Sequence, residues 1–283
     1  MSKNLESIKL PLGINSLGKG CFWHCSSLSS ISLPKKLTSL GTGCFRGCSS
    51  LTNIDLSCIT SLGALVLADC SKLKNVKLPS GITSLGAYFF DGCSSLESID
   101  LPLSLNSLGY CCFRDCSSLT NIYLPLGLTT LGGNSTPEDT DMGSGPVDET
   151  ESVRFLHGCF SGCSSLTSIN LPSGITSLGG DCFSGCRILT NINLPSGITS
   201  LGDNCFFGCR SLTSIKLPSG ITSLGDRCFR DCSSLTSVSL PSGINSLGEY
   251  CFLGCKGLAS IYMYAEQLPT MGYTVFENCD ADN

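Results

Sequence analysis

The sequence has little charge, few aromatic residues and almost no histidine. Charged residues make up 14% of the 283 residues and aromatic residues 7%, with two histidines and one tryptophan. The formal net charge of −5 excludes the basic surface with which proteins bind nucleic acid. No apolar run reaches the ~18 residues that a membrane-spanning helix needs, and residues 1–4 lack the basic and apolar stretches of a signal peptide. We therefore expect neither a membrane span nor an export signal.

Patterns of catalytic or metal-binding residues are missing as well. His24 precedes Cys25 and could be imagined as half of a Cys–His nucleophile pair, but its counterparts in other repeats are glycine and aspartate, which indicates an outward position. The Cys-x₃-Cys spacing differs from the C-x₂-C of zinc and redox sites. The glycine-rich stretch 40–47 lacks the G-K-[ST] of a phosphate loop. We predict no enzymatic activity, no cofactor and no metal site.

What the sequence does contain is a repeat. A unit close to L-x-S-I-x-L-P-x-G-I-x-S-L-G-x-x-C-F-x-x-C-S-S recurs throughout, and most of its copies are 23 residues apart. The units begin at Leu5, Leu28, Leu51, Leu73, Leu96, Leu119, Leu166, Leu189, Leu212, Leu235 and Leu258. Regular self-similarity at this period is typical of a solenoid. We predict one elongated domain, residues 1–283, of about eleven stacked coils joined by parallel β ladders.

The 21 cysteines favour a reduced core over a disulfide framework. They occupy two fixed positions of the repeat, and the first position is also filled by Val66, Phe89 and Val275. Apolar replacement is how a core position behaves, and free cysteine is among the most buried residue types. Pairs such as Cys228 and Cys232 would share a short helical or 3₁₀ turn. Outside these positions, Cys58 and Cys111 are the candidates for exposed thiols.

The stretch SLTSIKLPSGITSLGDRCFRDC at 211–232, together with its copies, resembles the BspA-type leucine-rich repeat family. The resemblance implies an α/β leucine-rich-repeat solenoid that is rich in β structure, with short helical or 3₁₀ turns. Members of this family occur mainly in bacteria and parasitic protozoa, often at the cell surface, and are implicated in adhesion to host matrix proteins or cells. The resemblance thus implies a surface or secreted protein, whereas the missing signal peptide and reduced thiols favour the cytoplasm.

One insertion interrupts the repeat. About 24 extra residues, 134–157, separate Gly132 from Gly158, which neighbouring units join almost directly. The segment is rich in Ser, Thr, Pro, Gly and acidic residues, so we expect a flexible surface loop. It could be a tolerated insertion, a contact for a basic partner or, with loosely spaced acids, a calcium site. Asn134 begins an N-glycosylation sequon.

The fifth position of the unit varies on an otherwise uniform scaffold, as expected for a recognition face. Apart from two serines, its residues are Lys9, Asp55, Lys77, Asp100, Tyr123, Asn170, Asn193, Lys216 and Tyr262. Tyrosine is enriched in protein interfaces. We predict a non-enzymatic protein that binds a protein or glycan ligand, either as an adhesion module or as an intracellular scaffold. Uncapped end coils would also permit a homo-oligomer.

Overall fold

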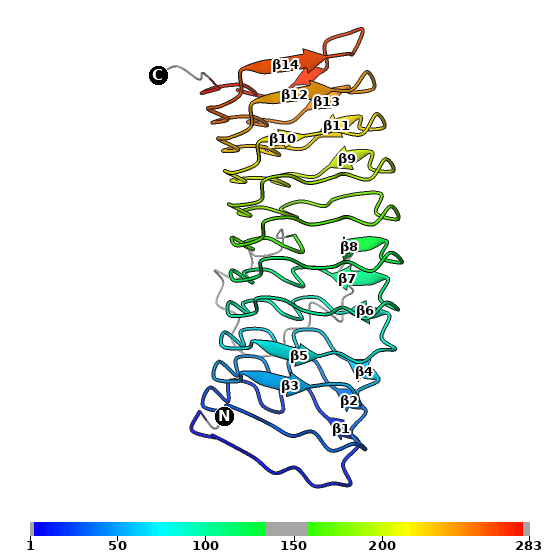
Figure 1. Ribbon diagram of the computed structural model, residues 1–283, viewed down its shortest axis with the longest axis vertical. Helices are drawn as coiled ribbons and strands as arrows, with labels where there is room; N and C mark the ends of the chain where they lie inside the picture. The colour runs from blue at the N-terminus through cyan, green and yellow to red at the C-terminus, as the bar shows by residue number, and fades with distance from the viewer. Residues whose placement is uncertain (1–2, 134–157, 280–283) are drawn as a thin grey trace.

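The chain folds as a parallel β-solenoid. The computed structural model describes residues 3–133 and 158–279, which form about 10 turns stacked along one axis. Figure 1 shows the first coil at one end of the stack and the last coil at the other, so that each coil contacts only its neighbours. The predicted leucine-rich-repeat solenoid with parallel ladders is confirmed.

The strands lie in two β ladders, one on each side of the proline-containing turn, and breaks in the pairing divide these ladders into five sheets. The first contains β1 (Ser16–Leu17), β2 (Ser39–Leu40), β4 (Ser61–Leu62), β6 (Ser84–Leu85), β7 (Ser107–Gly109), β8 (Thr130–Gly133), β9 (Ser200–Leu201), β11 (Ser223–Leu224), β13 (Ser246–Leu247) and β15 (Thr270–Met271). The second contains β3 (Asn53–Asp55), β5 (Asn75–Lys77), β10 (Ser214–Ile215), β12 (Ser237–Leu240) and β14 (Ser260–Met263). The strands pair in parallel, and equivalent residues of adjacent units face one another.

The Cys-Phe segments differ in detail from the short helical or 3₁₀ turns that the sequence suggests. The described part of the chain contains no helix, and these segments are runs of hydrogen-bonded turns. Arg227 and Asp231 adopt positive φ angles of 54° and 61°, which interrupt any helix. Amides alternate in direction: that of Cys232 bonds within its own turn, to Phe229, whereas that of Phe229 bonds to Cys251 in the next coil. The turns thereby join the coils as a third line of hydrogen bonds.

The core consists of columns of equivalent side chains, most of them identical from coil to coil. Phe229 is fully buried, and its ring stacks on Phe206 and on Phe252 with centroids 5.3 Å apart in each case. Leucines, isoleucines and cysteines form parallel columns beside the rings. Such stacking removes apolar surface from water at both faces of every internal coil, which is the main source of stability in a solenoid.

The cysteines are free and mostly buried, as predicted. All but Cys21, Cys58 and Cys279 are buried, and burial raises the pKa of Cys182 to about 12. From the second coil onward the second cysteine position has an additional role, because its thiol donates a hydrogen bond to a phenylalanine or leucine carbonyl of the preceding coil. In one example, Cys232 Sγ lies 3.2 Å from the carbonyl oxygen of Phe206. This bond explains why apolar residues replace only the first cysteine.

The glycine that ends the first ladder is required by close approach of neighbouring coils. A Cβ on Gly41 would lie 2.6 Å from the backbone nitrogen of Lys19, and one on Gly225 would lie 2.6 Å from that of Asp203. Real Cβ atoms do not come this close to backbone, so any larger residue would push the coils apart.

One surface cluster contradicts a prediction. Cys111, expected to be exposed, is fully buried, and burial raises its pKa to about 12. It belongs to a small apolar cluster with Leu65 and Tyr88, which occupy the equivalent position in the two preceding units. These three apolar residues occupy the same outward position in successive coils and bury one another. A single unit of the repeat does not reveal this burial, because it depends on the residues in the neighbouring coils.

A buried ion pair lies beside this cluster. Arg114 donates to Asp91 through Nε at 2.7 Å and through Nη2 at 2.9 Å, and both side chains are about nine-tenths buried. Burial raises the pKa of Asp91 to about 6, with Asp69 and Asp115 adding to the shift, although Arg114 opposes it.

The coils on either side of residues 134–157 are stacked directly on each other. Thr167 Oγ1 donates to the Thr120 carbonyl oxygen at 3.1 Å, and the Phe113 amide donates to Cys159 at 2.9 Å. Elsewhere such bonds join residues about 23 positions apart, whereas Thr167 and Thr120 are 47 apart. Residues 134–157, including Asn134 and its sequon, lie outside the described residues.

Candidate binding face

On the exposed side of the second ladder, every other residue of each strand points outward. Equivalent residues of successive coils therefore form columns along the surface. In β3, Asn53 and Asp55 are exposed whereas Ile54 is buried, because successive side chains of a strand point to opposite sides. The third and fifth positions of every unit therefore project into solvent. We call this surface the ladder face.

All nine residues predicted for recognition are exposed on the ladder face. Parallel registers join several of them directly: Asp55 faces Lys77, and Asn193 faces both Asn170 and Lys216. Tyr262 in β14 faces Ser239. The fifth position thus forms one column along the solenoid, as the repeat predicts, and its role in binding stays a prediction.

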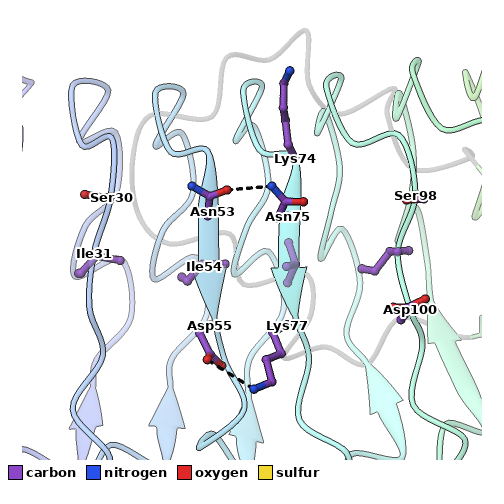
Figure 2. A pocket seen from close by; sticks show the side chains of 12 residues that line it. Ser30, Ile31, Asn53, Ile54, Asp55, Lys74, Asn75, Lys77, Ser98 and Asp100 are labelled. Carbon is purple, nitrogen blue, oxygen red and sulfur yellow. Dashed lines mark hydrogen bonds and ion pairs between the residues drawn. The ribbon is translucent and has the colours of Figure 1, made fainter.

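The structure groups three of these residues in a shallow groove. Asp55, Lys77 and Asp100 line a depression of about 460 Å³ that crosses four coils, shown in Figure 2. Asp55 Oδ2 lies 3.8 Å from Lys77 Nζ, and both side chains are exposed. A hydrogen bond from Ser57 contributes most to lowering the pKa of Asp55, which is therefore ionised at neutral pH.

Two asparagine side chains that line this groove are hydrogen-bonded to each other. Asn75 Nδ2 donates to Asn53 Oδ1 at 2.9 Å, as Figure 2 shows. This bond shows that side chains at the third position can bridge adjacent coils. Lys74 also lines the groove but carries no ion pair among the described contacts.

A second groove lies toward the C-terminal end of the ladder face. Asn193 and Lys216 line it, together with Pro218, Pro241 and Tyr264, and its volume is about 660 Å³. Both grooves are open depressions, so they suit an extended macromolecular surface better than an enclosed small molecule.

The other four predicted residues lie outside both grooves, and sequence reasoning missed some residues within them. Lys9, Tyr123, Asn170 and Tyr262 line neither depression. Lys74, by contrast, occupies the second position of its unit, which is threonine or serine in most units. A lysine at a position that is otherwise mostly threonine or serine could therefore have identified Lys74 from the sequence.

Residues 3–133 and 158–279 contain no cluster of three histidine, cysteine or acidic side chains placed to hold a metal. His24 is exposed and stacks on Trp23. Within the same ranges, no helix has the length and apolar character needed to cross a bilayer.

Comparison with known proteins identifies relatives that share this fold. The model of the BspA type leucine rich repeat region matches six copies, over residues 1–68, 57–138 and 155–282. A leucine-rich repeat protein from Bacteroides ovatus is similar, with 28% identity, a TM-score of 0.72, and coverage of 95% of this chain and 69% of that chain.

Two further solved structures share the fold. A leucine rich cell surface protein from Faecalibacterium prausnitzii has 24% identity and a TM-score of 0.64, covering 98% of this chain and 77% of that one. The pneumococcal vaccine antigen PcpA has 18% identity and a TM-score of 0.58, covering 93% and 69%. No curated protein matches the sequence. The family match extends over nearly the whole chain, and this protein therefore belongs to the BspA-type leucine-rich repeat family.

Proposed function

We propose that the protein is a non-enzymatic module that binds a protein or glycan ligand through the ladder face, as a cell-surface or secreted adhesion module. One observation carries the proposal: a single exposed column changes its chemistry from coil to coil while the core columns beside it stay nearly constant. Constant core positions maintain the fold, whereas variable exposed positions are free to match a partner.

The shape of the ladder face supports a macromolecular ligand. The first groove extends over four coils, with Lys74 and Lys77 alongside Asp55 and Asp100. Charges of both signs on an open surface give specificity and orientation to a large partner. Membership of the BspA-type family, with its surface-located members, supports the adhesive role.

Binding can be tested on the column itself. We would combine Asp55→Ser, Lys77→Ser and Asp100→Ser, because the repeat already uses serine at this position in Ser32 and Ser239. We expect the triple variant to keep the parent's thermal stability and to lose binding to purified extracellular-matrix proteins. Lys72→Ser, an exposed lysine at a position that is serine in most units, is the matched control. Unchanged binding by the triple variant would exclude this groove.

An intracellular scaffold is the alternative, and the thiols favour it. Burial of free cysteines, with their thiols donating to backbone carbonyls, suits a reducing compartment. Antibody labelling of intact, unpermeabilised cells separates the two proposals, because only a surface protein is labelled before the cells are opened. Labelling confined to permeabilised cells would support the scaffold.

A further inference from the structure

Three large apolar side chains project into solvent from two neighbouring coils in the middle of the solenoid. Leu103 is 89% exposed, Leu126 is 90% exposed and Tyr123 is 81% exposed. We call these residues the apolar patch. Solvent exposure of this extent leaves almost the whole of each side chain available to a partner.

The fold does not require leucine at these positions. Leu103 and Leu126 occupy the eighth position of their units, directly after the proline, where most other units have serine. The serines at this position are Ser80, Ser173, Ser196, Ser219 and Ser242. The same turn therefore forms with a small polar residue, and stability gives no reason for an apolar one. Two adjacent coils have replaced serine with leucine at a place where it makes little contact with the protein.

The stacking of the coils brings the patch together. The Thr129 amide donates to the Asn106 carbonyl at 2.9 Å, and Ser107 pairs with Thr130, so the turns that carry Leu103 and Leu126 lie one above the other. Tyr123 is three residues before Leu126 in the same coil. It also follows Asp100 in the fifth-position column, which makes the patch continuous with the end of the first groove.

Two exposed acids lie in the same coil as Leu103, and one of them, Asp100, precedes Tyr123 in the fifth-position column. The other acid is Glu97. Neither forms an ion pair among the described residues, in contrast to Asp55, which lies 3.8 Å from Lys77. Exposed apolar side chains in a coil with exposed carboxylates complement a partner that combines an apolar side chain with a basic one.

We propose that the apolar patch is the docking point for a protein segment that carries an aliphatic or aromatic side chain beside lysine or arginine. This inference rests on the proposed function, because it names the class of partner that the ladder face recognises. The apolar side chain would cover Leu103, Tyr123 and Leu126, and the basic group would pair with Asp100 or Glu97. Burial of the apolar side chains supplies affinity, and the charge pair fixes direction.

The experiment is a selection with a defined probe. A phage-displayed library of random 12-residue peptides is selected on the intact chain, after depletion on the Leu103→Ser/Leu126→Ser double variant. We expect the enriched peptides to combine apolar residues with lysine or arginine. A synthetic peptide of enriched sequence should bind the double variant about ten-fold or more weakly than the parent. Glu97→Gln/Asp100→Asn should weaken binding by several-fold and remove its dependence on salt.

The chain offers a matched control. Leu12 occupies the same position in the first unit and is 78% exposed, so Leu12→Ser makes the same change outside the patch. It should leave peptide binding unchanged, and thermal melts should show that all variants fold. Equal binding by the double variant, enriched peptides without basic residues, or no enrichment would each overturn the proposal.

Self-association is a separate outcome. A dimer of the parent in sedimentation velocity that Leu103→Ser/Leu126→Ser abolishes would identify a second copy as the occupant and overturn the proposal. Failure here is distinguishable from failure of the proposed function, which is measured by matrix-protein binding with the Asp55, Lys77 and Asp100 variants and by cell labelling.

Discussion

The thiol of Cys209 donates a hydrogen bond to the carbonyl oxygen of Phe183, one coil earlier, at 3.2 Å. The same oxygen accepts the amide of Cys186 at 3.1 Å. Cys205, four residues before Cys209, belongs to the column in which other units have Val66 and Val275. The two buried cysteines of one unit therefore have different roles. Cys205 fills space in the core, whereas Cys209 also donates a hydrogen bond.

This difference predicts unequal effects of the same substitution. Cys205→Val should change the free energy of unfolding little, because the repeat already accepts valine there. Cys209→Val should cost about 1 kcal/mol more, which is the worth of one hydrogen bond when the carbonyl keeps its other donor. Urea unfolding of both variants measures the difference. Equal destabilisation would mean that the thiol bond contributes nothing.

Removal of one ring from the phenylalanine column should be severe. Phe229→Ala leaves a cavity between Phe206 and Phe252 and should cost about 3–5 kcal/mol in urea unfolding. Phe207→Ser is the control, because Phe207 is partly exposed and equivalent units have Ser161 and Ser184. A Phe229→Ala variant as stable as the parent would disprove the inward assignment of this column.

Asp91 should make stability depend on pH. Its pKa is raised from 3.8 to about 6 in the folded chain, so the folded state binds this proton more tightly than the unfolded state. The contribution is therefore fully present below pH 3.8 and is lost as the pH rises through about 6. We expect a loss of the order of 2 kcal/mol across this window. Unfolding of the parent and of Asp91→Asn, measured from pH 4 to pH 8, isolates the effect as their difference. A parent that gains stability relative to the variant over this window would contradict the sign.

Deletion of residues 134–153 should leave the solenoid folded. The coils on either side already exchange hydrogen bonds directly, as between Thr167 and Thr120. The deletion removes six acidic residues and no basic ones, so the net charge should change from −5 to +1 and the isoelectric point should rise well above 5.0. Circular dichroism and isoelectric focusing test both expectations. Unfolding on deletion would show that the segment is structural.

Much of the fold could be predicted from the sequence because a repeat multiplies every local signal. Phenylalanine recurs at the position of Phe229 in nearly every unit, which predicts a core column, and the complete burial of Phe229 confirms this. The turn geometry was harder to predict, because Arg227 and Asp231 adopt positive φ angles although neither is glycine. The only hint in the sequence is that some other units have glycine at these positions, such as Gly43 and Gly47. The burial of Cys111 depends on which residues neighbouring coils place beside it.

The grooves were not predictable for a related reason. A depression at Asp55 and Lys77 arises from the relative sizes of side chains on successive coils, and no single unit contains that information. The exposed position of each residue follows from its place in the repeat, whereas the shape of the surface depends on the order of the repeats.

The near identity of whole units gives this architecture an evolutionary consequence. The nine-residue stretch LPSGITSLG occurs unchanged at 78–86, 171–179, 194–202 and 217–225. Recombination between the corresponding gene segments would add or delete complete coils without disturbing the phenylalanine column, since the rings of these units meet equivalent neighbours. Each such event would move Lys77 and Lys216 closer together or further apart by one step of about 5 Å. The distance between two contact points could thus evolve in fixed increments, without any point mutation in either of them.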